Sequence, residues 1–121
     1  ILKTNILRDG HMAVYGIYFD TGKSEIKPES TATIKEIAEL IQKNPSLQIY
    51  IVGHTDNVGK LSDNLELSDK RAEAVVNELI TKYKVSSKNL QAEGVGPLAP
   101  VATNDTNEGK ELNRRVEIVK K

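Results

Sequence analysis

Residues 47–79 read LQIYIVGHTDNVGKLSDNLELSDKRAEAVVNEL, and this stretch decides the fold. It begins with an apolar run, LQIYIVG at residues 47–53, which is rich in β-branched residues and typical of a buried strand. After a polar stretch, apolar side chains recur at helical spacing from residue 72 to residue 83, and Ser68 is a plausible N-cap for this helix. The stretch therefore predicts a strand, a polar loop and a helix.

The flanking segments predict further elements. Residues 1–19 predict a hairpin, because Asp9-Gly10 is a strong turn signal between two apolar runs. Apolar residues at i, i+3, i+4 and i+7 predict an amphipathic helix around residues 34–41, which Asn44-Pro45 ends. Strands are predicted at residues 89–96 and 114–120, and the long loop between them contains a short helical turn at residues 107–112.

Strands that alternate with helices predict an α+β fold, an α/β sandwich in which two main helices pack on one face of a single sheet. Crossover helices favour parallel strand pairs and the N-terminal hairpin adds an antiparallel one, so we expect a mixed sheet of about four strands. Within 121 residues we expect an N-terminal extension or hairpin strand at residues 1–12 and one domain at residues 13–121. Because the N-terminus begins as if inside a strand and lacks a signal-peptide core, we expect an excised domain of a longer protein.

The composition excludes several classes of function. Lys plus Arg equals Asp plus Glu at 17 each, so the overall field does not favour nucleic acid or anionic lipid as a partner. The absence of cysteine excludes disulfides, thiolate chemistry and Cys-based zinc sites. No apolar run approaches the roughly 20 residues that span a bilayer.

The sequence does not predict an enzyme or a cofactor. It contains neither a Gly-x-Ser-x-Gly elbow nor a phosphate loop. His54 and Asp56 share one side of an extended strand, but two ligands are fewer than the three or four that a zinc site needs. We therefore expect no metal site and interpret His54 as a hydrogen-bonding residue at a strand end.

Asp56 and Arg71 are the most informative charged residues. If the helix begins near Ser68, Arg71 lies in its first turn, where the helix dipole disfavours a cation unless an anion compensates. The two side chains either form a plain ion pair or jointly receive a ligand that carries an ammonium and a carboxylate on one carbon. Asn64 lies between them and can donate or accept a hydrogen bond. The spacing alone leaves both alternatives open.

The C-terminal strand adds a second arginine. Period-two alternation places Arg114 on the face of Val116 and Ile118, and Arg115 on the face of Glu117. Arg114 is therefore the better candidate for a site at the rim of the helical layer. A solvated arginine pair is the alternative.

Five segments together resemble one family. They are YFDTGKSEIKPE, VGHTDNVG, DNLELSDKRAEAVVNEL, AEGVGPLAP and NEGKELNRRVEIV, and they occur in the order expected of the OmpA-like C-terminal domain, which is also found in peptidoglycan-associated lipoproteins and flagellar stator subunits. The resemblance covers roughly residues 13–119. Its combination of motifs is specific, whereas any one motif alone is weak.

The resemblance implies a domain that binds peptidoglycan without covalent attachment, through the zwitterionic end of meso-diaminopimelate in the stem peptide. It implies that Asp56 takes the ammonium and Arg71 the carboxylate, with Asn64 and Arg114 in support. It also implies that the segment formed by Phe19, Asp20 and Thr21 lines the pocket. The implied location is the periplasmic face of the bacterial envelope, in a parent protein attached to or embedded in the outer membrane.

Two departures from the family pattern accompany this resemblance. Residues 1–12 lie outside the core motif, and the sequence has no lipid-attachment cysteine, so the anchoring mode stays open. A rival hypothesis keeps the fold but uses the same groove for a protein partner of the envelope.

Overall fold

The computed structural model describes the backbone of residues 2–121 and the side chains of residues 5–121. A four-stranded sheet has the order β1-β4-β2-β3. Strands β2 and β3 are parallel, and β4 is antiparallel to both β1 and β2. The predicted mixed sheet is therefore confirmed. Its strands are β1 (His11–Val14), β2 (Ile49–His54), β3 (Leu90–Gly96) and β4 (Arg115–Lys120).

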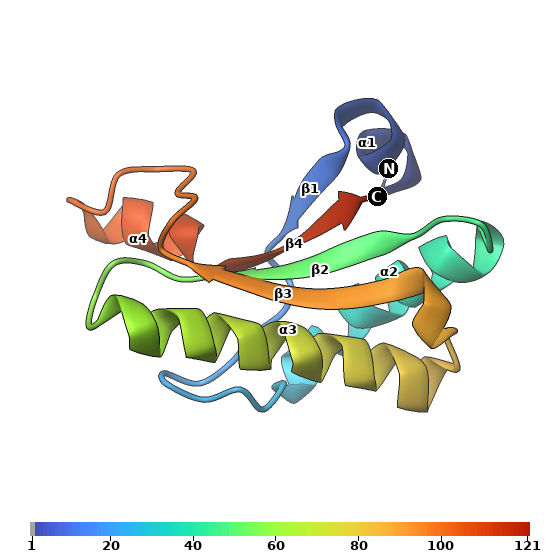
Figure 1. The fold of residues 1–121 in the computed structure, drawn as a ribbon, viewed down its shortest axis with the longest axis horizontal. Helices are drawn as coiled ribbons and strands as arrows, with labels where there is room; N and C mark the ends of the chain where they lie inside the picture. Colours follow the sequence, from blue (N-terminus) through green and yellow to red (C-terminus); the bar gives the residue numbers. More distant parts are fainter. Residues whose placement is uncertain (1) are drawn as a thin grey trace.

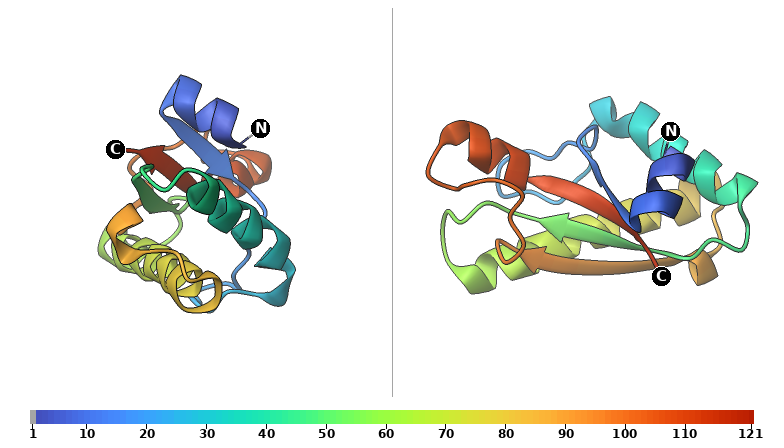
Figure 2. Two further views of the ribbon diagram at one scale, coloured as in Figure 1. Left: turned by 90° about the vertical axis from the view of Figure 1, so that its right-hand side faces the viewer. Right: turned by 90° about the horizontal axis from the view of Figure 1, so that it is seen from above.

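Two long helices cover one face of the sheet, as the sequence predicts. They are α2 (Thr31–Lys43) and α3 (Leu61–Tyr83), and they lie side by side beneath the strands (Figures 1 and 2). The short helix α4 (Asn107–Asn113) lies at the end of the sheet where β4 begins (Figure 1). Two single-turn 3-10 helices, Pro28–Ser30 and Ser87–Asn89, precede α2 and β3.

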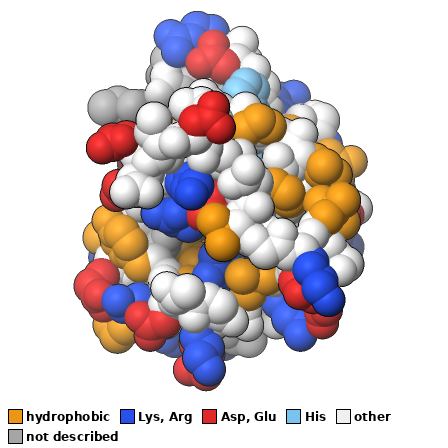
Figure 3. Space-filling model, turned by 90° about the vertical axis from the view of Figure 1, so that its left-hand side faces the viewer, with side chains coloured by type: hydrophobic (Ala, Val, Ile, Leu, Met, Phe, Trp, Pro, Cys, Tyr) orange, Lys and Arg blue, Asp and Glu red, His pale blue; other side chains and the backbone are white. Residues whose placement is uncertain are grey.

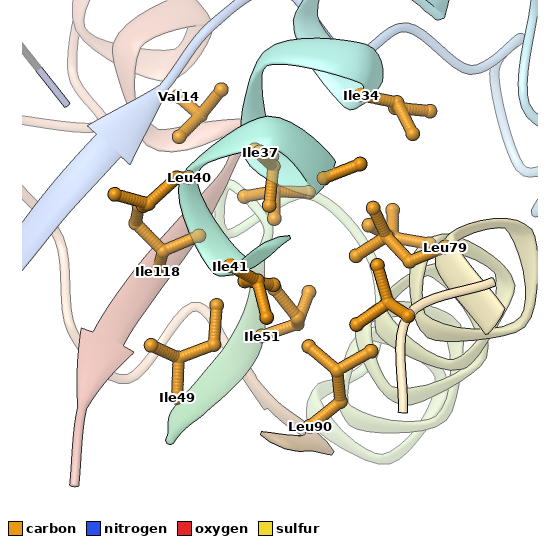
Figure 4. Close-up of a cluster of buried hydrophobic side chains, with 14 of the residues drawn as sticks. Val14, Ile34, Ile37, Leu40, Ile41, Ile49, Ile51, Leu79, Leu90 and Ile118 are labelled. Carbon is orange, nitrogen blue, oxygen red and sulfur yellow. The ribbon is translucent and has the colours of Figure 1, made fainter. Parts of the chain in front are cut away.

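The hydrophobic core lies between these two helices and the sheet. Ile37 and Ile41 of α2 lie between the helix and the strands, and Ile34 extends toward the side where Leu79 of α3 closes the core (Figure 4). Their side chains are buried because the apolar spacing of each helix places them on one face. On the sheet, alternate residues such as Ile49, Ile51 and Ile118 complete the same layer.

The predicted N-terminal hairpin is wrong. Residues Leu2–Asp9 form a helix, α1, and Ile1 lies outside the described residues. Gly10 has a φ of 78° and donates its N–H to the carbonyl of Ile6 over 3.0 Å, so the Asp-Gly signal ends a helix instead of turning a hairpin. The buried side chain of Ile6 fixes α1 on the core. The expected boundary between residues 12 and 13 falls inside β1.

The predicted start of the long helix is also wrong. Helix α3 begins at Leu61, so Ser68 lies inside it and Arg71 is the tenth residue after Leu61. Ser68 is fully buried: its Oγ accepts a hydrogen bond from the Gly96 N–H at 3.0 Å and donates to the Leu65 carbonyl at 2.9 Å. The hydroxyl that resembled a cap thus joins α3 to β3, and the helix-dipole argument does not apply to Arg71.

Candidate functional site

The candidate site lies at the end of the sheet where β2 ends and β4 begins. Asp56 follows β2 by two residues, and Arg114 immediately precedes β4. Because the two strands are antiparallel, with His54 paired to Arg115, these ends are neighbours. Arg114 donates from Nη1 to Oδ2 of Asp56 over 2.6 Å. Arg114 thus lies beside Asp56 at this end of the sheet.

Asp56 is held by its own loop. Only 9% of the residue is exposed, and its Oδ1 accepts the N–H of Val58 at 3.0 Å. The preceding residue, Thr55, donates its N–H to the carbonyl of Gly96 at 2.9 Å and so joins this loop to the end of β3. Each carboxylate oxygen has lone pairs beyond the one already used, so Asp56 can accept a further donor.

Arg71 reaches the site from α3 without an acidic partner. Its Nε donates to the carbonyl of Lys23 at 2.8 Å, and its Nη2 donates to the carbonyl of Asp20 at 3.2 Å. The guanidinium also lies 4.9 Å from the ring centroid of Phe19, a cation–π distance. Arg71 makes no ion pair within the described part of the chain, so the simple Asp56–Arg71 pair is wrong.

Electrostatics identify Arg71 and Arg114 as neighbours. Burial lowers the pKa of Arg71, the positive charge of Arg114 lowers it further, and Asp56 opposes the shift. Two guanidinium groups thus lie near one carboxylate, which pairs with Arg114 alone, so the charge of Arg71 is not neutralised by an ion pair. A half-buried arginine without a carboxylate partner can bind an anion, since its remaining donors match a carboxylate in geometry.

The segment at residues 19–21 supports Arg71 mostly through its backbone. Phe19 provides the ring, and its strand-like pairing with Ile26 closes the loop. The side chain of Asp20 turns away to pair with Lys27 at 3.3 Å, so only its carbonyl meets Arg71. Thr21 is exposed on the loop.

Asn64 organises the loop before α3. Its Nδ2 donates to the carbonyl of Val58 at 2.9 Å. Val58 is also the residue whose N–H binds Asp56, so Asn64 stabilises the turn that holds the carboxylate. Asn64 therefore lies beside the site, and its amide nitrogen holds the loop.

The sequence did not predict a buried polar cluster that lies behind the site. Arg115 is not solvated: only 2% of its side chain is exposed, and its Nε donates to Oε2 of Glu117 at 2.6 Å. His54 lies 3.9 Å from the same oxygen, and its Nδ1 is buried without a partner within the described residues. The signal was available in the alternation of β4, which puts Arg115 and Glu117 on one face.

The ionisation of this cluster follows from its surroundings. Burial and the charge of Arg115 lower the pKa of His54 to about 4, against the opposing effect of Glu117. For Glu117, burial by itself would raise the pKa, but the hydrogen bond and charge of Arg115 outweigh it and the pKa is lowered. The cluster therefore holds a neutral imidazole beside an Arg–Glu ion pair near neutral pH.

The surface at this end of the molecule is mixed. Figure 3 shows basic and acidic side chains meeting near the middle of the face, with hydrophobic side chains on both sides of them. Exposed apolar residues of the neighbouring loops include Val58, Leu98 and Val101. A groove of about 320 Å³ runs between loop residues 22–25 and α3. No three His, Asp or Glu side chains converge as metal ligands anywhere in the part of the chain that the structure describes.

Comparisons with known proteins show which family the chain resembles. Residues 18–114 match the OmpA family. The chain is 43% identical over 101 residues to outer membrane porin F of Pseudomonas aeruginosa, and the match covers 84% of this chain and 29% of the porin. It is 38% identical over 124 residues to motility protein B of Bacillus subtilis, covering 98% of this chain and 48% of that protein. The chain thus spans less than half the length of these two curated relatives.

Among solved structures, the peptidoglycan-associated lipoprotein of Burkholderia pseudomallei superposes with a TM-score of 0.78 and 29% sequence identity, and the match covers 95% of this chain and 92% of that one. The α+β architecture is therefore shared along nearly the whole chain. None of the helices in residues 2–121 combines the length and the apolar character needed to cross a bilayer.

Proposed function

Because the chain belongs to the OmpA family, we propose that it binds peptidoglycan without covalent attachment, through the diaminopimelate residue of the stem peptide. Such a module anchors the outer membrane or another envelope protein to the cell wall. The name of a structural neighbour, the peptidoglycan-associated lipoprotein, supports the ligand class. The outer-membrane porin among the relatives supports a location at the periplasmic face of the envelope.

One observation carries the proposal: Arg71 is half-buried beside Asp56 and Arg114 and has no acidic partner within the described residues. The side-chain end of diaminopimelate bears an ammonium and a carboxylate on one carbon. In our proposal, the ligand carboxylate binds Arg71 with Arg114 in support, and the ligand ammonium binds the open lone pairs of Asp56. Phe19 and the carbonyl groups of Asp20 and Lys23 hold Arg71 in place for this contact.

The binding should be reversible and individually weak. A small zwitterion buries little apolar surface, so most of its affinity must come from a few charge-assisted hydrogen bonds. A cell-wall polymer presents many such sites, and a high effective concentration compensates for modest affinity. The module therefore acts as an anchor through many weak contacts.

A titration by NMR tests the proposal. The labelled domain is titrated with a stem peptide that contains meso-diaminopimelate, and with the same peptide in which lysine replaces this residue. Lysine keeps the ammonium but lacks the carboxylate that Arg71 should receive. We expect the first peptide to shift amides around residues 19–21, 56, 71 and 114, and the second to bind roughly tenfold more weakly or not at all.

Three variants sharpen the assignment. Asp56→Asn and Arg71→Gln each remove one charge with little change of size, and both should weaken binding. Lys82→Gln removes a charge near the far end of α3, where Lys82 pairs with Glu78, and should bind like the wild type. Equal binding of the two peptides, or unchanged binding of folded Asp56→Asn, would contradict the proposed site. If no ligand binds but an envelope protein does, the rival function as a protein-partner module stands instead.

A further inference from the structure

The buried polar cluster behind the site contains His54, Arg115 and Glu117, and Asn113 extends it. All four are buried, and Arg115 and Glu117 lie on the face of β4 opposite to Val116 and Ile118 of the core. None of the four contacts Asp56 through a hydrogen bond or an ion pair within the described residues. The cluster is nevertheless close to the site along the chain: Asn113 and Arg115 flank Arg114, and His54 precedes Asp56 by two residues.

Arg115 uses its guanidinium to join three separate segments. It donates from Nε to Glu117 at 2.6 Å, from Nη1 to the carbonyl of Asn113 at 3.1 Å, and from Nη2 to the carbonyl of Ala99 at 2.9 Å. The acceptors belong to β4, to the end of α4 and to the loop after β3. A planar fork with fixed donor directions fits this arrangement, whereas the point charge of a lysine does not.

Asn113 makes a matching set of contacts on the other side of Arg114. It is fully buried, and its Oδ1 accepts the N–H groups of Val101 at 2.8 Å and Ala102 at 3.1 Å. Its Nδ2 donates to the Ala102 carbonyl and to Oδ1 of Asn104, both at 2.9 Å. The residues on both sides of Arg114 are therefore tied to the loop after β3.

The other half of the site is tied to the same cluster. His54 pairs with Arg115 in the sheet and precedes Asp56 by two residues. The backbone positions of Asp56 and Arg114 are thus both set within two residues of the buried cluster. Their side chains meet at 2.6 Å.

We propose that Arg115, with Asn113, is a positioning residue that holds Arg114 in register with Asp56 so that the two can receive a ligand together. This inference rests on the proposed function only in naming the ligand; the positioning itself is a property of the free protein. A buried Arg–Glu pair adds little net stability, because desolvation offsets most of the attraction. The hydrogen bonds of Arg115 are better explained by the backbone positions that they hold in place around Arg114.

The first experiment uses the protein without ligand. Arg115→Lys keeps the charge opposite Glu117 but loses the fork to Asn113 and Ala99. In the wild type, the Arg114 Nε–Hε group should be ordered on the picosecond-to-nanosecond timescale by ¹⁵N relaxation, because its guanidinium is held on Asp56. In Arg115→Lys the same group should become mobile. The control is Ile41→Val, a core variant on α2 that lowers stability and should leave the Arg114 signal ordered.

The second experiment measures affinity for the meso-diaminopimelate peptide in a double-mutant cycle. Arg115→Lys should weaken binding by roughly threefold or more, while Ile41→Val should leave it unchanged. When Arg114→Ala is already present, adding Arg115→Lys should have no further effect, because the residue to be positioned is gone.

The outcomes separate the two proposals. An equally ordered Arg114 in wild type and Arg115→Lys overturns the positioning role, whatever binds. Independent, multiplying effects of the two substitutions on affinity overturn it as well. If the wild type does not bind the peptide, the proposed function fails, and the relaxation experiment still decides whether Arg115 positions Arg114.

Discussion

At the scale of single residues, Arg71 illustrates how a charged side chain can be fixed without an opposite charge. Two backbone carbonyls and one aromatic ring hold it, and all three come from the loop at residues 19–23. Carbonyl oxygens stabilise the guanidinium without neutralising it. The positive charge therefore stays available to an anion, which an Asp56–Arg71 ion pair would have prevented.

Phe19 should accordingly matter through its ring. Phe19→Leu keeps the apolar character but removes the aromatic face, and we expect affinity for the meso-diaminopimelate peptide to fall roughly two- to fivefold, the size of an exposed cation–π contact. Phe19→Tyr retains the face and should bind like the wild type. Isothermal titration calorimetry on both variants checks this. A Leu variant as strong as the Tyr variant would mean that the ring only fills space.

His54 should make the stability of the fold depend on pH. Its pKa falls from 6.5 to about 4 on folding, so the unfolded chain binds more protons between these values. The contribution of His54 is therefore fully present above about pH 6.5 and is lost as the pH falls toward 4, by roughly 3 kcal/mol. The lowered pKa of Glu117 extends the loss to more acid pH, where its ion pair with Arg115 is removed.

Urea unfolding between about pH 4 and pH 8 measures this dependence. In His54→Gln the slope between pH 6.5 and 4 should flatten. His11→Gln is the matched control, because His11 also contacts Glu117, at 3.2 Å, but is largely exposed. If the slope persists in His54→Gln and disappears in His11→Gln, the pH dependence comes from His11 and the prediction is wrong.

At the scale of elements, α3 determines where the site lies. The helix packs so closely on β2 and β3 that a Cβ on Gly53 would lie 2.2 Å from the Ser68 carbonyl oxygen. A Cβ on Gly94 would lie 2.2 Å from the backbone nitrogen of Asp69. Backbone atoms at this distance cannot yield as a flexible side chain does. The close contact fixes the position of Arg71 relative to the ends of both strands.

Gly94→Ala tests this contact. We expect it to destabilise the protein by about 3 kcal/mol or more, because α3 must move away from the sheet. Gly59→Ala is the control: Gly59 has a φ of 90° but open space around it, so only about 1 kcal/mol of backbone strain is expected. Equal midpoints of urea unfolding for the two variants would show that α3 shifts freely.

The elements also show what the sequence could predict. Strong periodicity identified β2, β3, β4 and α2, because burial on one face imposes a spacing on the residues. The ends of the helices were harder to predict. Lys60 precedes α3 without a side-chain hydrogen bond, so the true start at Leu61 carries no capping signal, whereas the buried hydroxyl of Ser68 imitates one. Asp9-Gly10 likewise suits a hairpin turn and a helix end equally.

For the candidate site, the sequence predicted which residues belong to the site better than it predicted which of them contact one another. Charge logic and resemblance together selected Asp56, Arg71 and Arg114, and the structure brings these three to one end of the sheet. It did not predict that Asp56 pairs with Arg114, because a long arginine side chain can reach several acceptors. It also missed the carbonyls of Asp20 and Lys23, since every residue type carries this acceptor and the sequence does not mark it.

At the scale of the whole molecule, the site and the described chain ends are separated. The candidate site lies at the end of the sheet marked by α4 and the β2–α3 loop, whereas α1 and the C-terminus lie toward the other end (Figure 1). The hydrophobic core fills the space between them. Anything attached through the C-terminus would therefore leave the site free.

The antiparallel pairing of β2 with β4 has a mechanical consequence. Asp56 follows the last residue of β2, and the C-terminus follows the last residue of β4, so these two points lie at opposite ends of a hydrogen-bonded pair of strands. A pull between a wall fragment bound at Asp56 and the C-terminus would slide the two strands past each other in shear. Every rung of the β2–β4 ladder would then share the load at once, instead of opening one after another as in a zipper.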